Sequence, residues 1–294
     1  MQLLGILSAL PWWLIPFLLL CSLALFVRAA YITHRACWRV PLPSAKEMQP
    51  CAHEDVPRAI FLRNLPRTSR RDAAILAALA FCDSPAYVHI LRGDKVFRLE
   101  ALAWLFERNI ALVQNALTDD PTRCLFSASE RHLCAFFWLL PFTSCISLWA
   151  KVRAGLLWFP VLFGLKPFMR LLSIGKQFDQ TTQLVVHEHV RCSEREKTVV
   201  LERMVVDPGV QGRGLGSACL TAALAPQATA PVVLSTQLQR NVEFYSRIGF
   251  HVVLERRFGA PGDPFGFRSW WMLRAAPAQV SAGASEGASE GQPR

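Results

Sequence analysis

Residues 198–224 read TVVLERMVVDPGVQGRGLGSACLTAAL, and this stretch decides the fold. Its first part, residues 198–206, is rich in β-branched and apolar residues, which favours a buried strand. The Asp-Pro-Gly run at 207–209 breaks the strand, and an Ala- and Leu-rich helical pattern begins after Gly214. The stretch therefore predicts a strand, a glycine-rich loop and a helix.

The glycine-rich loop suits an anion such as a pyrophosphate. Gly212, Gly214 and Gly216 allow close approach of the backbone, and the free amides at the helix start attract negative charge. Two well-known phosphate loops are excluded. Leu215 stands where a nucleotide-triphosphate loop requires Lys, and Ser217 stands where the dinucleotide fingerprint requires Gly.

A second informative block, residues 231–253, reads PVVLSTQLQRNVEFYSRIGFHVV. An apolar run ends at Ser235, a helical pattern begins near Gln239, and Gly249 marks the end of that helix before another apolar strand. The two blocks together predict alternating strands and helices.

Both blocks resemble the GNAT acyltransferase superfamily. The run from Gln211 to Gly216 resembles its acetyl-coenzyme A (acetyl-CoA) loop, Q/R-x-x-G-x-G/A, which follows a strand ending in V-x-P. The second block resembles its N-x-x-x-[FY]-Y-x-x-x-G-F helix. The matching residues there are Asn241, Phe244, Tyr245, Gly249 and Phe250.

Within the superfamily, the chain looks similar to the puromycin N-acetyltransferase group. Residues 268–274 resemble that group's last strand, and residues 72–87 resemble its first helix and the following loop, with Phe81, Asp83 and Pro85 as an F-x-D-x-P signature. Two further strands are predicted at 123–127 and 133–140. The similarity touches most of residues 58–275.

The resemblance implies an α/β GNAT fold, with a mixed, mostly antiparallel central sheet, splayed strands and flanking helices. It also implies acetyl-CoA as the acyl donor. The implied donor-binding residues are Met204, Val205, Val206, Gln211, Gly212, Arg213, Gly214, Leu215, Gly216, Ser217 and Asn241. A backbone amide of residues 204–206 would stabilise the oxyanion that forms during transfer.

Tyr245 and Glu202 are the candidate catalytic residues. Tyr245 has an ordinary pKa of about 10 and can donate a proton to the leaving thiolate. Glu202 is the acid within the central strand, where an apolar setting would raise its pKa, and strand alternation places it on the face of Met204 and Val206. An ion pair between Glu202 and a neighbouring arginine is an equally good interpretation. His187 and His189, expected on an extended segment, are alternative bases.

The N-terminal residues 1–27 contain no Asp, Glu, Lys or Arg and exceed the roughly 20 apolar residues that cross a bilayer. We predict an uncleaved transmembrane anchor; the alternative is a signal peptide cut after Ala29. The juxtamembrane linker, residues 28–54, begins with several cations, which favours a catalytic domain at 55–275 on the cytosolic side. The Ser-, Gly- and Glu-rich residues 276–294 predict a disordered tail.

An apolar insert at 133–172 departs from the superfamily pattern. We expect a buried strand that stops at Pro141 and passes into apolar helices; a second membrane segment, and hence a polytopic protein, is the alternative. The side chains expected at a membrane interface are Trp149, Trp158, Phe159 and Phe163, together with Lys151, Arg153, Lys166 and Arg170.

The amino-acid composition limits the classes of partner that the chain is expected to bind. The chain has 294 residues, is 52% hydrophobic and only 18% charged, and carries a formal net charge of +10, which excludes a disordered or fibrous protein and indicates an anionic partner. The sequence has no stripe of basic residues interleaved with aromatic residues, so it does not favour binding to nucleic acid. We expect no metal site, because no cysteine or acid stands at zinc-ligand spacing from His187 and His189.

The expected activity is acetyl transfer to an amine of an unidentified small molecule or peptide; a non-catalytic acyl-CoA-binding module is the alternative. The oligomeric state is not predicted.

Overall fold

The structure, a computed structural model, describes residues 20–23, 25–27, 62–116, 124–128, 133–144 and 146–276. In chain order its elements are β1 (Arg63–Asn64), η2 (Arg67–Ser69), α3 (Arg70–Phe81), α4 (Pro85–Ile90), α5 (Lys95–Ala116), β2 (Cys124–Ala128), β3 (Leu133–Pro141), α6 (Leu148–Arg153), η4 (Leu156–Trp158), α7 (Phe159–Phe163), α8 (Leu165–His189), η5 (Cys192–Lys197), β4 (Val199–Val206), η6 (Pro208–Val210), α9 (Leu215–Leu224), η7 (Ala225–Gln227), β5 (Val232–Thr236), α10 (Gln239–Ser246), β6 (His251–Phe258) and β7 (Phe267–Arg274).

The strands form one mixed sheet in the order β1-β2-β3-β4-β5-β7-β6. Neighbouring strands are antiparallel except β4 and β5, which run parallel. The mixed, mostly antiparallel sheet expected from the sequence is therefore confirmed. The predicted first helix and the strands at 123–127, 133–140, 198–206, 231–235 and 268–274 are also present, with ends shifted by one or two residues.

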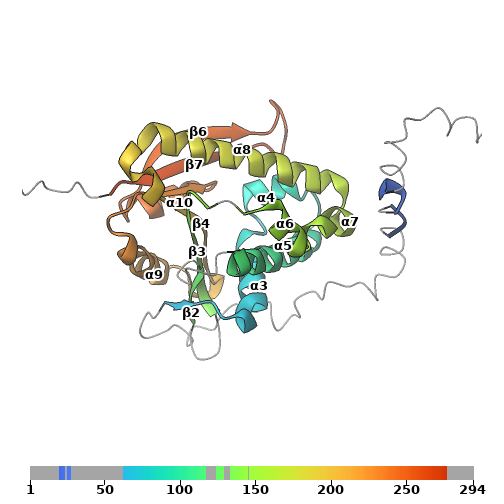
Figure 1. The fold of residues 1–294 in the computed structure, drawn as a ribbon, viewed down its shortest axis with the longest axis horizontal. Coiled ribbons are helices and arrows are strands. Elements are labelled where there is room, and N and C mark those ends of the chain that lie inside the picture. The colour runs from blue at the N-terminus through green and yellow to red at the C-terminus, as the bar shows by residue number, and fades with distance from the viewer. Residues whose placement is uncertain are drawn as a thin grey trace, which may run out of the picture.

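Helices cover both faces of the sheet. On one face Phe136, Trp138 and Val205 pack into a core shared with α3, α5 and α8. On the other face Phe137 and Leu201 belong to a core shared with α9 and α10. Figure 1 shows α3 and α5 on one side of β3 and β4 and α9 on the other.

The central strands separate part-way along their length. β4 pairs with β5 only from Val199 to Leu201, opposite Val232 to Leu234. The β4 residues 203–206 pair with β3 alone, whereas Ser235 and Thr236 pair only with β7. This separation is the predicted splay, and it leaves one edge of β4 without a strand partner after Leu201.

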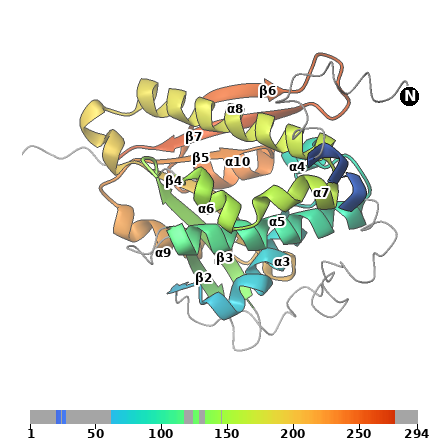
Figure 2. The same cartoon turned by 45° about the vertical axis from the view of Figure 1, so that its right-hand side comes forward.

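The apolar insert folds as part of the domain. β3 is buried along most of its length and ends at Pro141, after which α6, η4 and α7 lead into α8. Figure 2 shows α6 and α7 between α5 and α8. Among the described residues, no helix has both the length and the apolarity needed to cross a bilayer. The expectation that Phe159 and Phe163 lie at an interface is wrong, because both rings are buried against Trp104.

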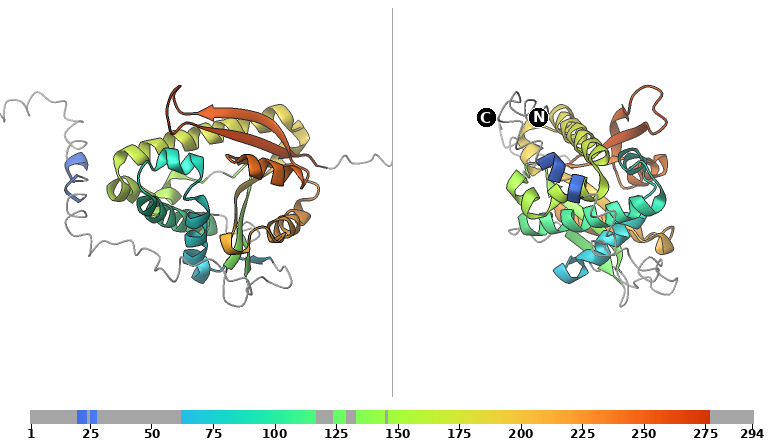
Figure 3. Two further views of the ribbon diagram at one scale, coloured as in Figure 1. Left: turned by 180° about the vertical axis from the view of Figure 1, so that it is seen from behind. Right: turned by 90° about the vertical axis from the view of Figure 1, so that its right-hand side faces the viewer.

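The long helix α8 packs along the hairpin formed by β6 and β7, as the view from behind in Figure 3 also shows. The Phe178 ring lies 4.8 Å from that of Phe258 and 5.1 Å from that of Trp271. Two hydrogen bonds flank this contact: Arg256 donates to Thr181 at 2.7 Å, and the Trp271 indole donates to Thr182 at 3.0 Å. Aromatic packing and these bonds fix α8 on the sheet.

Most of the N-terminal prediction lies outside the described residues. Residues 20–23 and 25–27 are helical, and nearly all their side chains are exposed. The rest of the anchor at 1–27, the linker at 28–54 and the tail beyond residue 276 are not among the described residues, so the anchor, the linker and the tail stay predictions.

Replacing Phe178 by Ala tests the attachment of α8. Because the ring is only partly buried, we expect the free energy of unfolding to fall by about 2–3 kcal/mol, somewhat less than for a fully buried Phe. Denaturant unfolding of the full chain measures the change. The matched control is Leu184→Ala on the same helix, whose side chain is exposed and whose effect should stay within about 0.5 kcal/mol. Equal effects of the two variants would contradict this account of the packing.

Candidate functional site

The unpaired edge of β4 presents backbone groups to the space between β4 and β5. The Asp207 N–H donates to Cys134 O of β3 at 2.9 Å, so the alternation of an antiparallel strand turns the N–H and C=O groups of Val206 and Met204 away from β3. The Val206 carbonyl accepts a hydrogen bond from Gln211 Nε2 at 2.9 Å. The Met204 amide is therefore placed to donate to a ligand lying along this edge.

The glycine loop after β4 has the backbone geometry of an anion site. The Asp207 carboxylate accepts from the Gly209 N–H at 2.7 Å and ends the strand. Gly212 and Gly214 have φ values of 80° and 79°, which favour glycine, and Gly214 caps the start of α9. The first-turn amides of α9 have no carbonyl of their own helix to pair with. Gln211, Gly212, Arg213, Gly214 and Ser217 are exposed, so an anion can reach this turn.

Gly216 holds the start of α9 close to β4. A Cβ atom there would lie 3.4 Å from both the Met204 and the Val206 side chains and 3.7 Å from the Phe244 ring. The absence of a side chain thus lets the loop, the end of β4 and α10 meet. The structure brings the predicted donor-binding segments 204–206 and 211–217 together.

The α10 helix brings Tyr245 to the same place. Gly249, with φ 93°, ends the helix, and the Phe250 N–H returns to Tyr245 O at 3.1 Å. The Tyr245 side chain is buried, and its hydroxyl donates to the Met204 sulfur at 3.7 Å. Burial raises the pKa of Tyr245 well above its ordinary value, so the hydroxyl keeps its proton at neutral pH. Asn241, one turn earlier, donates to Thr236 at 3.1 Å.

Glu202 lies in a β-bulge, which changes the face predicted for it. Trp138 pairs with Arg203 but the next residue of β3 pairs with Leu201, so Glu202 is the extra residue of β4. The bulge shifts the alternation: Leu201 and Met204 face α9 and α10, whereas Arg203 lies over the Phe81 ring on the opposite side. The prediction that Glu202 shares the face of Met204 and Val206 is therefore wrong.

The environment of Glu202 is also more polar than expected. Its side chain is 39% exposed, and Arg203 donates to its carboxylate at 3.2 Å. The apolar setting predicted from the strand sequence is absent because the bulge turns the side chain away from the core. The alternative interpretation, an ion pair with a neighbouring arginine, is confirmed.

Sequence reasoning missed two side chains beside Glu202. Arg203 interacts with Tyr87 of α4 as well as with Glu202. Asp179 of α8 lies within electrostatic reach of Glu202: desolvation and, second, the negative charge of Glu202 raise the pKa of Asp179, while Lys151 opposes the shift. Neither the contact of Arg203 with Tyr87 nor the approach of Asp179 was identifiable from a motif, because α4 and α8 are separate elements that only the fold brings to β4.

The two predicted alternative bases lie on a helix. His187 and His189 belong to the last turn of α8 rather than to an extended segment. Their side chains therefore point in different directions. The His187 ring meets Phe142, and His189 lies 4.0 Å from the Glu188 carboxylate. The expectation that both histidines lie on an extended segment is wrong.

The α4 helix is tied to the loop between β6 and β7. His89 Nδ1 lies 3.0 Å from Phe265 O, and Arg92 forms an ion pair with Asp263. The Phe265 N–H, followed by Arg92, lowers the pKa of Asp263. These bonds join α4, which carries Tyr87 beside Arg203, to the far hairpin.

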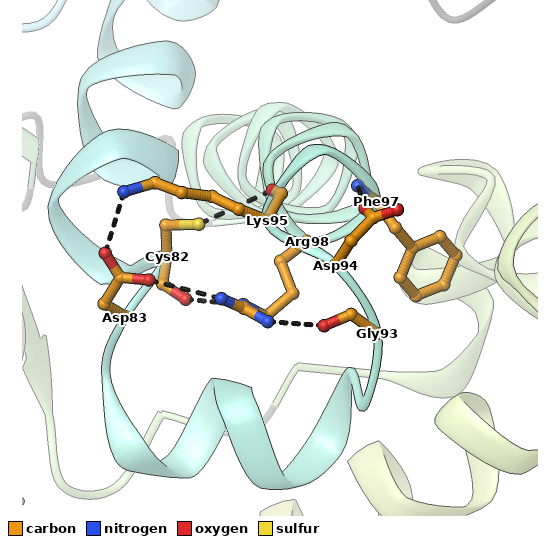
Figure 4. Close-up of polar contacts among 7 residues, drawn as sticks. All are labelled: Cys82, Asp83, Gly93, Asp94, Lys95, Phe97 and Arg98. Atoms are coloured by element: carbon orange, nitrogen blue, oxygen red, sulfur yellow. Dashed lines mark hydrogen bonds and ion pairs between the residues drawn. The ribbon is translucent and has the colours of Figure 1, made fainter.

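The loop between α3 and α4 is held against the beginning of α5, as Figure 4 shows. The Asp83 carboxylate accepts from Lys95 at 3.0 Å and from Arg98 at 3.2 Å. Arg98 also donates to the carbonyl oxygens of Cys82 and Gly93. The Lys95 hydrogen bond is the main reason that the pKa of Asp83 is lowered. The predicted F-x-D-x-P signature thus has a structural role at Asp83.

Comparison with known families supports the interpretation of this site. Residues 178–252, from α8 to the beginning of β6, match the family model described as acetyltransferase (GNAT) domain. This part of the chain therefore carries the sequence pattern of a GNAT acetyltransferase domain. The match includes the open edge of β4, the glycine loop and α10, and GNAT acetyltransferases use acetyl-CoA as the acetyl donor.

One of three solved structures that match the chain over most of its length has a TM-score above 0.5 and so resembles it in fold. The C-terminal condensation domain of Ebony, in complex with beta-alanyl-dopamine, has a TM-score of 0.52 and 8% identity over 73% of this chain and 98% of that domain. A Corynebacterium glutamicum protein described as histone acetyltransferase HPA2 and related acetyltransferase has a TM-score of 0.47 and 14% identity, over 76% and 99%. Arabidopsis thaliana Naa50, bound to the bisubstrate analogue CoA-Ac-MVNAL, has 0.40 and 10%, over 74% and 98%.

Replacing Asp83 by Asn tests how the loop between α3 and α4 is held against the beginning of α5. Because the folded-state pKa of Asp83 is lowered, its stabilisation is complete above the unfolded pKa of about 3.9 and is lost as pH falls through the folded value. Both ion pairs involve an exposed carboxylate, so we expect a loss of about 0–1 kcal/mol at neutral pH. Unfolding of both proteins as a function of pH measures it, with Glu196→Gln as an exposed control. A difference that grows as pH falls would refute this assignment.

Proposed function

We propose that this protein transfers an acetyl group from acetyl-CoA to an amine of a small molecule or peptide. The observation that carries the proposal is the meeting of three elements: the open edge of β4, the glycine loop at the start of α9 and the buried hydroxyl of Tyr245. That hydroxyl lies 3.7 Å from the Met204 sulfur, beside the strand segment whose amide is directed away from β3. Donor binding, oxyanion stabilisation and proton donation thus fall to adjacent residues.

The donor would lie across the end of β4. Gln211 to Ser217 would hold the pyrophosphate through the amides of the loop and the first turn of α9, supported by the positive charge of Arg213. The pantetheine arm would pair with the edge of β4 at residues 204–206, in the place that β5 leaves after Leu201. Asn241 would bind the end of that arm through its carbonyl oxygen or its second amide N–H, while the first N–H donates to Thr236.

Tyr245 would act as the general acid. The amine nitrogen attacks the thioester carbon, the Met204 amide stabilises the oxyanion, and the carbon–sulfur bond breaks as the Tyr245 hydroxyl gives its proton to the leaving sulfur. Burial keeps this hydroxyl protonated before transfer. Solvent then returns the proton to Tyr245.

The acceptor amine would approach from the face that carries Glu202. Glu202 and Asp179 place two carboxylates near each other, which favours an ammonium group between them. Glu202 would take the proton of the attacking amine directly or through a water molecule. Its exposed position allows that exchange, while Arg203 orients the carboxylate.

We also propose that residues 1–27 anchor the protein in a membrane with the GNAT domain on the cytosolic side. The support is the uncharged 27-residue apolar run and the cationic residues that follow it.

An assay of the purified full chain with acetyl-CoA and a panel of amines, in which the release of the CoA thiol is measured, tests the proposed activity. In the same assay Tyr245→Phe should lower kcat by about 10²–10⁴-fold, because the acid is lost while the ring is retained. The acetyl-CoA dissociation constant should not change. Asn241→Ala is the contrasting variant and should raise the KM for acetyl-CoA instead. Acetyl-CoA binding without transfer to any amine would favour the non-catalytic binding module.

The role of Glu202 is tested by Glu202→Gln, which removes the base but keeps the shape. We expect kcat/KM for the amine to fall, while the dissociation constant for acetyl-CoA stays unchanged. Glu196→Gln on η5 serves as the control for loss of an exposed carboxylate. If Glu202→Gln turns over at the wild-type rate at every pH, Glu202 has no part in proton transfer.

A further inference from the structure

Large apolar side chains gather on the outer surface of the insert. Their exposed fractions range from 52% to 74%. We call this surface the insert face; it consists of Leu148, Trp149, Leu157, Trp158, Leu165, Met169 and Leu172. Soluble proteins expose such side chains singly, whereas a group of them marks a site of interaction with a protein or a membrane.

The insert face is continuous in the fold. Leu148 and Trp149 begin α6, which contacts η4, and η4 and α7 lead directly into α8. On α8, Leu165, Met169 and Leu172 follow the spacing that places side chains on one side of a helix. Figure 2 shows α6, α7 and the beginning of α8 next to one another.

These exposed side chains are not a loosely packed part of the core. The same short elements bury Phe159 and Phe163 against Trp104, with ring centroids 6.0 Å and 5.8 Å apart respectively. On α8, Ile174 is also buried. The inner side of the insert therefore already has its partners, and the exposed side needs another explanation.

The charged residues of the insert segment itself all have one sign. Residues 133–178 include five Lys and Arg and no Asp or Glu. Lys151, Arg153, Lys166 and Lys176 are exposed, and Arg170 is partly buried. The surface thus combines exposed Trp and Leu side chains with cations, which is the composition of segments that lie in the interface of an anionic bilayer.

A second copy of the chain fits this surface less well. A two-fold contact would bring each insert face against its own equivalent, and so would place like charges opposite one another. An anionic lipid surface accepts both the apolar side chains and the cations.

We propose that the insert face docks the folded domain on an anionic phospholipid surface. Trp149 and Trp158 enter the boundary between headgroups and acyl chains, and the exposed lysines bind lipid phosphates. This contact goes beyond the proposed acetyl transfer and does not depend on the N-terminal residues 1–27, because it belongs to described elements of the domain.

Quenching of tryptophan fluorescence by brominated lipids tests the proposal. The full chain is reconstituted in vesicles of phosphatidylcholine, with or without phosphatidylserine, that carry either ordinary or brominated acyl chains. The emission of Trp149 and Trp158 is obtained by subtracting the fluorescence of the double variant Trp149→Phe/Trp158→Phe from that of the wild type. We expect bromine to quench this difference in vesicles that contain phosphatidylserine. Matching thermal unfolding of the two proteins confirms that the substitutions leave the fold intact.

Trp270 provides the matched control. It lies on β7 and packs against the core cluster shared with α9 and α10, on the other face of the sheet from α8, and its indole donates to Glu255 at 3.0 Å. The difference between the wild type and Trp270→Phe should be equal in ordinary and brominated lipids. If the signal of Trp149 and Trp158 behaves in the same way, the insert face does not touch the bilayer and the proposal is overturned.

The lysines test the charge requirement. Each cation near an anionic surface strengthens binding about fivefold, so Lys151→Gln/Lys166→Gln should reduce docking by about 25-fold and with it the quenching. If quenching requires neither phosphatidylserine nor these lysines, the proposal that the docking surface is an anionic lipid is overturned. Cross-linking of two chains through the insert face without quenching would assign the face to a second copy.

Discussion

The separation of β4 from β5 after Leu201 is the constraint on which the site depends. A strand interior normally pairs on both edges, and an unpaired edge leaves backbone donors that must be satisfied in another way. Here the β4–β5 pairing ends at Leu201, and Gln211 donates to the open edge at Val206. The glycine loop and α10 both lie next to this edge, so a ligand that paired with β4 would lie beside all three elements.

The bulge at Glu202 divides the end of β4 into two chemical surfaces. Met204 and Val206 face α9 and α10, where Tyr245 is buried. Arg203 and Glu202 face the opposite side, towards α4 and α8. One extra residue in the strand therefore separates the surface proposed for the thioester and its leaving group from the surface proposed for the amine. The α8 helix contributes Asp179 to the second surface, and the beginning of α8 carries part of the insert face.

Predictions that rested on local chemistry were confirmed. The glycines at 212 and 214 adopt positive φ values, Gly249 ends α10, and the strand and helix boundaries of residues 198–258 follow propensity and turn residues. Predictions that assumed unbroken periodicity were wrong. The face of Glu202 changed because a bulge in β4 depends on its pairing with β3. His187 and His189 were expected on an extended segment but lie in α8. The sequence did not indicate this because most of the stability of a helix in a folded protein comes from tertiary packing.

The sequence by itself determined the strand, glycine loop and helix of the donor site and the resemblance to the GNAT superfamily, because each depends on residues close together in the chain. Only the tertiary structure decided which side chains share the acceptor face. Asp179, Arg203 and Tyr87 belong to different elements, and the bulge and the packing of α8 set their positions. The tertiary structure likewise decided that Phe159 is buried and Trp158 exposed, because neighbouring apolar residues differ only in which of them meets Trp104.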